Sequence, residues 1–174
     1  MSLTRILRTS NTQSLKKAFQ TPPTPIMSAQ KSSVAIALVG LHTEIGAPVA
    51  EGLRPEWDVT RFIQSFEAAK ADLPYLLSGE APPNPPTNDV GSGTYSSPVR
   101  AVVFGRGFTQ QQAEELHALY NDLAPSVVWL AGSAATRPAG AGPPANVEKT
   151  LVPMFRAKLE ELVKDGAEGG LVLY

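Results

Sequence analysis

The chain has 174 residues and a formal net charge of −1 at pH 7, enough length for one ordinary domain with extensions. A net charge so close to zero gives no electrostatic footprint for nucleic acid and no basic surface for a membrane. The chain has no cysteine, which excludes disulfides, a thiolate nucleophile and thiolate metal ligands. Its histidines, His42 and His117, are far apart and fit no metal-binding spacing. We therefore expect no metal site, no nucleic acid and no membrane partner.

The first 31 residues differ in composition from the rest. No acidic residue precedes Glu44, while the segment is basic and rich in Ser and Thr, and Leu3, Ile6 and Leu7 share a helical face. These features are typical of a mitochondrial presequence, followed here by a Pro-rich linker at residues 21–25. We predict the mitochondrial matrix as the location. The alternatives are a disordered tail and, if translation starts at Met27, a cytoplasmic protein.

Residues 32–174 alternate between strand-like and helix-like patterns. Short apolar or β-branched runs predict strands at residues 34–39, 57–63, 99–104, 126–132 and 171–174. Helical spacing predicts helices up to about residue 53, from 66 to about 77, over 110–123 and over 146–164, and Thr109 with Gln112 forms a capping-box pattern. The Pro- and Gly-rich stretch at residues 79–98 is expected to be a flexible insert.

This alternation predicts an α/β fold, a single Rossmann-like three-layer domain. Its five-stranded sheet is expected to be mostly parallel, with helices on both faces. The first expectation for the strand order is 3-2-1-4-5. The flavodoxin-like order 2-1-3-4-5 is the alternative, because the connection between the second and third strands is unclear.

The first strand leads into a glycine-bounded turn. The stretch Gly40-x-x-Thr43-x-Ile45-Gly46-x-Pro48-Val49-Ala50 resembles the first βα turn of the atypical or extended short-chain dehydrogenase/reductases, nitrogen-metabolite-repression type. Thr43 stands where the middle glycine belongs, and its Cβ narrows the approach of a pyrophosphate. The resemblance implies binding of NADP or NAD over Gly40, His42, Thr43, Ile45 and Gly46, often without catalysis. A βα turn that binds nothing is the alternative.

Other turns should reach the same sheet edge, because parallel strands end there together. They supply the remaining candidate cofactor contacts: Gln64 and Ser65 after the second strand, Gly105 and Arg106 after the third, and Gly132 after the fourth. Gln64 and Ser65 occupy the place where an acidic residue would select NAD, so NADP is slightly favoured. Arg106 could pair with a phosphate or be a solvated cation.

No catalytic residue is expected. Short-chain reductases use a Tyr-x-x-x-Lys pair, and no tyrosine of this chain has that lysine. The nearest substitute is Tyr95, with Arg100 five residues later. We therefore expect a protein that binds NAD(P)(H) or a related nucleotide as a sensor, regulator or degenerate reductase. The alternatives are a ligand-free interaction or assembly protein and a small oxidoreductase completed by a partner subunit, so a protein partner or a homo-oligomer is open.

Overall fold

The computed structural model of the protein describes residues 33–133, 135, 146–164 and 169–174. The expected presequence, the linker and Met27 lie outside the described residues. The flexibility expected of residues 79–98 stays a prediction, but the place of this segment is defined by contacts given below.

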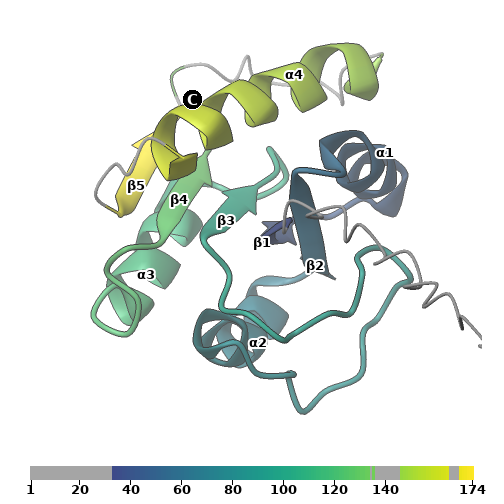
Figure 1. Ribbon diagram of the computed structural model, residues 1–174. Coiled ribbons are helices and arrows are strands. Elements are labelled where there is room, and N and C mark those ends of the chain that lie inside the picture. The colour runs from purple at the N-terminus through teal and green to yellow at the C-terminus, as the bar shows by residue number, and fades with distance from the viewer. Residues whose placement is uncertain (1–32, 134, 136–145, 165–168) are drawn as a thin grey trace, which may run out of the picture. The chain divides into compact units, whose positions relative to one another are not determined.

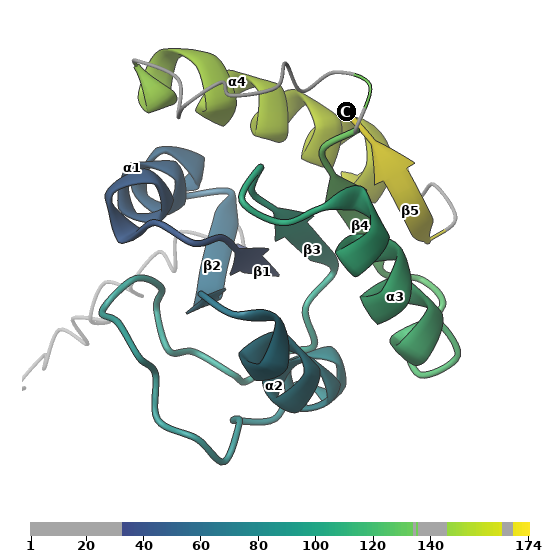
Figure 2. The same ribbon diagram turned by 180° about the vertical axis from the view of Figure 1, so that it is seen from behind.

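A five-stranded parallel sheet forms the centre of the domain, with helices on both faces (Figures 1 and 2). The fold class expected from the sequence is confirmed. The strands are β1 (Val34–Val39), β2 (Trp57–Ile63), β3 (Ala101–Phe104), β4 (Val128–Ala131) and β5 (Gly170–Leu173). The helices are α1 (Thr43–Leu53), α2 (Phe66–Ser78), α3 (Gln110–Tyr120) and α4 (Val147–Leu159), the last continued by the π-helical turn η2 (Glu160–Lys164).

The strand order is β2-β1-β3-β4-β5. The first expectation, 3-2-1-4-5, was therefore wrong, and the alternative order is the one observed. β3 pairs with β1, with Ile36 opposite Ala101 and Val39 opposite Phe104. The outer edge of β2, which the rejected order would have used, is covered by the chain itself: Ser92 N–H donates to Val59 O at 2.8 Å and Gly93 N–H to Thr60 O at 3.1 Å.

Alternating side chains of the strands form a separate apolar cluster on each face. On β1, Ala37 and Val39 face the α2 and α3 side, while Ile36 and Leu38 face the α1 and α4 side. Because the strands are covered on both faces, they read as continuous apolar runs in the sequence. This explains why their positions could be predicted closely.

α2 continues through Pro74 to Ser78, close to the end expected near residue 77. A proline lacks the N–H that would bond to the carbonyl four residues earlier, which here belongs to Lys70. The hydroxyl of Tyr120 in α3 donates to Lys70 O at 2.7 Å, so this carbonyl has a donor from the neighbouring helix. The capping box is confirmed at the start of α3, where Thr109 accepts from Gln112 N–H and Gln112 accepts from Thr109 N–H.

We call residues 84–95 the strap, because they lie over the outer edge of β2 and contact both faces of the sheet. Val90 packs against the α1 and α4 cluster, and Tyr95 against the α2 and α3 cluster. Gly91 has φ +112°, and a Cβ on it would lie 3.0 Å from Thr60 O, so only glycine allows the backbone this close to β2.

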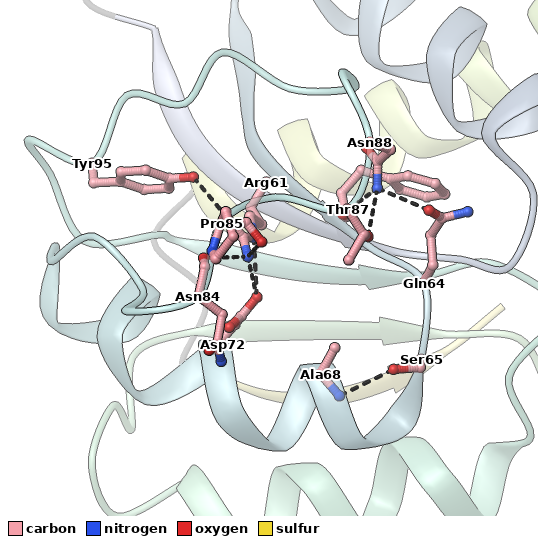
Figure 3. A network of polar contacts seen from close by, with 11 residues as sticks. Arg61, Gln64, Ser65, Ala68, Asp72, Asn84, Pro85, Thr87, Asn88 and Tyr95 are labelled. Carbon is pink, nitrogen blue, oxygen red and sulfur yellow. Dashed lines mark hydrogen bonds and ion pairs between the residues drawn. The ribbon is translucent and has the colours of Figure 1, made fainter.

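Arg61 of β2 anchors the strap (Figure 3). Its guanidinium donates to Asp72 Oδ2 at 2.7 and 3.0 Å, and to the carbonyls of Asn84 and Pro85 at 3.0 and 3.3 Å. The side chains of Arg61 and Asp72 are only 6% and 4% exposed. A buried arginine needs both a counter-charge and acceptors for its other donors, and the strap supplies those acceptors.

Candidate functional site

In the sheet, β2 lies on one side of β1 and β3 lies on the other. The order in which successive strands are added to the sheet therefore reverses between β1 and β3. Open parallel sheets bind ligands beyond the carboxyl ends of the strands at such a point. Here the turn after β1, residues 40–42, lies beside the turn after β3, residues 105–109, and Gly105 N–H donates to Val39 O at 2.7 Å. This edge, with the amino end of α1 beside it, is the candidate site.

The ring of Phe62 packs against Gly40 and Gly46, the two glycines of the first turn. A Cβ on Gly46 would lie 2.7–3.0 Å from three atoms of that ring, and one on Gly40 would lie 3.0 Å from Phe62 Cε2. Phe62 belongs to β2 and is 3% exposed. Close packing between helix and strand therefore accounts for both glycines without a ligand.

The amino end of α1 offers donors and an acidic side chain. The amides of Ile45 and Gly46 both donate to His42 O, at 3.1 and 2.9 Å, which leaves the amides of Thr43 and Glu44 as the outward donors of the first turn. The imidazole of His42 lies 3.3 Å from the carboxylate of Glu44, and both side chains are exposed. An anionic ligand here would accept hydrogen bonds from these amides and be stabilised by the helix dipole, but the negative charge of Glu44 would repel it.

The residues expected to choose between NAD and NADP have partners within the protein. Gln64 Nε2 donates to Leu41 O at 3.1 Å. Gln64 Oε1 accepts from Asn88 Nδ2 at 3.0 Å, as Figure 3 shows. Ser65 is the N-cap of α2 and accepts from Ala68 N–H at 3.1 Å. These contacts show structural uses for both residues.

Leu41 lies across the switch point. A Cβ on Gly107 would lie 2.6 Å from Leu41 Cγ. The Leu41 side chain, from the turn after β1, therefore packs directly on the backbone of the turn after β3. Leu41 is nevertheless 45% exposed. It is an apolar surface at the mouth of the site that was not predicted from the sequence.

The turns after β3 and β4 meet around Tyr174. A Cβ on Gly132 would lie 3.5 Å from Arg106 Cγ and 3.9 Å from the Tyr174 hydroxyl. That hydroxyl donates to Phe104 O at 2.8 Å, and the ring lies edge-on to Phe155 at 5.3 Å. Burial raises the pKa of Tyr174 to about 12, against the opposing effect of the Arg106 charge.

The expected site residues thus fall into two groups on one sheet edge. Gly40, His42, Thr43, Ile45, Gly46 and Gln64 form the first, around the start of α1; Gly105, Arg106 and Gly132 form the second, around Tyr174. Ser65 belongs to neither group, because its side chain caps α2. Tyr174 was missed, although the rule that parallel strands end together, applied to the fifth strand, would have placed it at this edge.

Tyr95, the nearest substitute for a reductase acid, belongs to the strap. Its hydroxyl accepts from Arg61 Nη1 at 3.4 Å, beside β2 and not between β1 and β3. No group of His, Cys, Asp or Glu that could hold a metal occurs among the residues described. Of the helices that the structure describes, none is long and apolar enough to span a membrane.

Comparison with known proteins gives one distant relative. The chain is 28% identical over 137 residues to a protein named Kojic acid related protein 6 from Aspergillus oryzae, and the match covers 78% of this chain and 81% of the relative. No protein-family model matches the chain, and no solved structure matches it.

Proposed function

We propose that the domain binds a phosphate-bearing nucleotide at the edge between β1 and β3 and acts as a sensor or regulator without a complete reductase site. The observation that carries this proposal is the strand order. It brings two glycine-containing turns and the amino end of α1 to one switch point, with the cation Arg106 on the turn after β3.

The same order bears on the class of nucleotide. In flavodoxin, which has the order 2-1-3-4-5, FMN binds at the β1/β3 switch point, whereas folds with the order 3-2-1-4-5-6 bind dinucleotides. The first-turn pattern favours NADP or NAD as the ligand, and the strand order adds a smaller nucleotide such as FMN as a candidate. The amides of Thr43 and Glu44 and the guanidinium of Arg106 would receive its phosphate, and Leu41 would contact its base or ring system.

Isothermal titration of the full chain with FMN, NADPH and NADH tests this proposal. At least one of them should bind, and Arg106→Gln should weaken binding by roughly tenfold, the lower end of what a charge-assisted hydrogen bond contributes. Arg100→Gln is the matched control, because Arg100 is also exposed but precedes β3, at the opposite edge of the sheet. Absence of binding by all three at millimolar concentration would contradict the proposal.

A ligand-free interaction module is the second candidate. It is favoured by the contact of Leu41 with Gly107 and by the hydrogen bond of Gln64 to Leu41 O, which close part of the edge with the protein's own atoms. On this account the glycines serve packing alone. The interaction module would be favoured if the titrations with nucleotide released no heat and if Arg106→Gln left the stability of the domain unchanged.

A further inference from the structure

The strap is joined to the candidate site by a short series of hydrogen bonds. Asn88 Nδ2 donates to Gln64 Oε1 at 3.0 Å and to Phe62 O at 3.1 Å, and Asn88 Oδ1 accepts from Val90 N–H at 3.0 Å. Gln64 Nε2 in turn donates to Leu41 O at 3.1 Å. The side chain of Gln64 thus contacts both the strap and the first βα turn. Figure 3 shows Asn88 and Gln64 facing each other.

The strap is attached at three places: at Arg61, at the edge of β2 through the amides of Ser92 and Gly93, and at Asn88. The attachments at Arg61 and Asn88 differ in character. At Arg61 it is held by a buried guanidinium whose counter-ion, Asp72, is also buried. Releasing that end would leave buried donors without acceptors. At Asn88 the contacts are only partly buried, so water can replace them when they break. The strap can therefore open at Asn88 while it stays attached at Arg61.

We propose that the strap regulates the candidate site, and that seating of Asn88 on Gln64 holds the first βα turn closed. While Gln64 is held by Asn88, it fixes the carbonyl of Leu41, and the Leu41 side chain rests on Gly107 across the switch point. Opening of the strap at Asn88 frees Gln64, and the first turn can then move away from Gly107. Linkage makes the effect reciprocal, so a ligand that displaces Leu41 also loosens the strap. This last consequence rests on the proposed function.

Hydrogen exchange of the ligand-free full chain tests the coupling itself. Asn88→Asp keeps the oxygen that accepts from Val90 but removes the donor to Gln64 and Phe62. Gln64→Glu keeps the oxygen that accepts from Asn88 but removes the donor to Leu41. We expect each variant to speed exchange at the far end: Ile45 and Gly46 in Asn88→Asp, and Ser92 and Gly93 in Gln64→Glu, by roughly fivefold or more.

The neighbouring variant Asp89→Asn is the control. Asp89 is exposed, and its change alters the charge of the strap without touching these hydrogen bonds, so its exchange pattern should match that of the unmodified chain. Gln64→Met provides an uncharged second variant that removes both of the Gln64 contacts and should speed exchange at both ends. The coupling is refuted if each variant changes exchange only at amides next to the substituted residue.

Ligand titration then separates the two proposals. Where FMN or NADPH binds the unmodified chain, Asn88→Asp should bind it roughly fivefold more tightly, while Asp89→Asn should not. Unchanged or weakened binding by Asn88→Asp would overturn regulation by the strap and leave the nucleotide site intact. Absence of binding in every variant would contradict the proposed function, and the exchange data would still decide whether the strap and the first turn move together.

Discussion

Replacement of Gly46 by valine should destabilise the domain through Phe62. A Cβ at position 46 would lie 2.7, 2.8 and 3.0 Å from three atoms of the Phe62 ring, where carbon atoms normally approach to about 3.5–4.0 Å. The ring is buried and belongs to β2, so it cannot swing into solvent. Overpacking of this kind costs roughly 1–3 kcal/mol.

The helix itself contributes a smaller effect of opposite sign. Gly46 lies inside α1, and replacing glycine by valine at an exposed helical position stabilises the helix by a few tenths of a kcal/mol. We therefore expect the free energy of unfolding to fall by about 1–3 kcal/mol in Gly46→Val. Ala47→Val is the control, since Ala47 is the next residue of α1 and is exposed; it should cost less than about 0.7 kcal/mol.

Urea unfolding gives the measurement, with fluorescence of the fully buried Trp57 and Trp129 as the probe. A double-mutant cycle with Phe62→Leu identifies the partner, because a smaller side chain removes the ring that Gly46→Val meets. The substitutions should couple by roughly 1–3 kcal/mol. Equal stability of Gly46→Val and Ala47→Val, or additive effects of Gly46→Val and Phe62→Leu, would refute this explanation of the glycine.

Three further predictions concern the strap anchor, the tyrosine at the site and catalysis. Asp72→Ala leaves the buried charge of Arg61 uncompensated, and urea unfolding should show a loss of roughly 3–5 kcal/mol; a loss below 1 kcal/mol would contradict the importance of the pair. Because burial raises the pKa of Tyr174 from 10.0 to about 12, its stabilising contribution is complete below pH 10 and is lost as the pH rises towards 12. Tyr174→Phe should flatten this fall in stability, and an unchanged pH profile would argue against it. The pure protein should not oxidise NADH or NADPH with ketones, aldehydes or quinones, and turnover that disappears in Tyr95→Phe would show otherwise.

The strands could be predicted from the sequence because each carries its own signal. β2 was expected at residues 57–63 and is found there, since a strand buried on both faces reads as an apolar and β-branched run. The cap of α3 was likewise local, because Thr109 and Gln112 lie within one helical turn.

Features that depend on distant residues were missed. The helix α2 was expected to pass Pro74, but the donor that serves the unpaired Lys70 carbonyl could not be predicted, because Tyr120 lies 50 residues away in the sequence. In the observed strand order the strap covers the outer edge of β2, and the composition of residues 79–98 does not reveal these contacts. The glycine spacing pointed to a phosphate, yet the ring that requires both glycines is that of Phe62 in the next strand.

The central claim is that a nucleotide occupies the edge between β1 and β3. Mapping of backbone amide chemical shifts during titration with FMN or NADPH tests it most directly, because it locates the ligand residue by residue. We expect the largest shifts at residues 40–46 and 105–109, smaller ones at residues 132–133, and a marked reduction of all of them in Arg106→Gln. Shifts centred on another part of the domain, or no shifts at millimolar ligand, would contradict it.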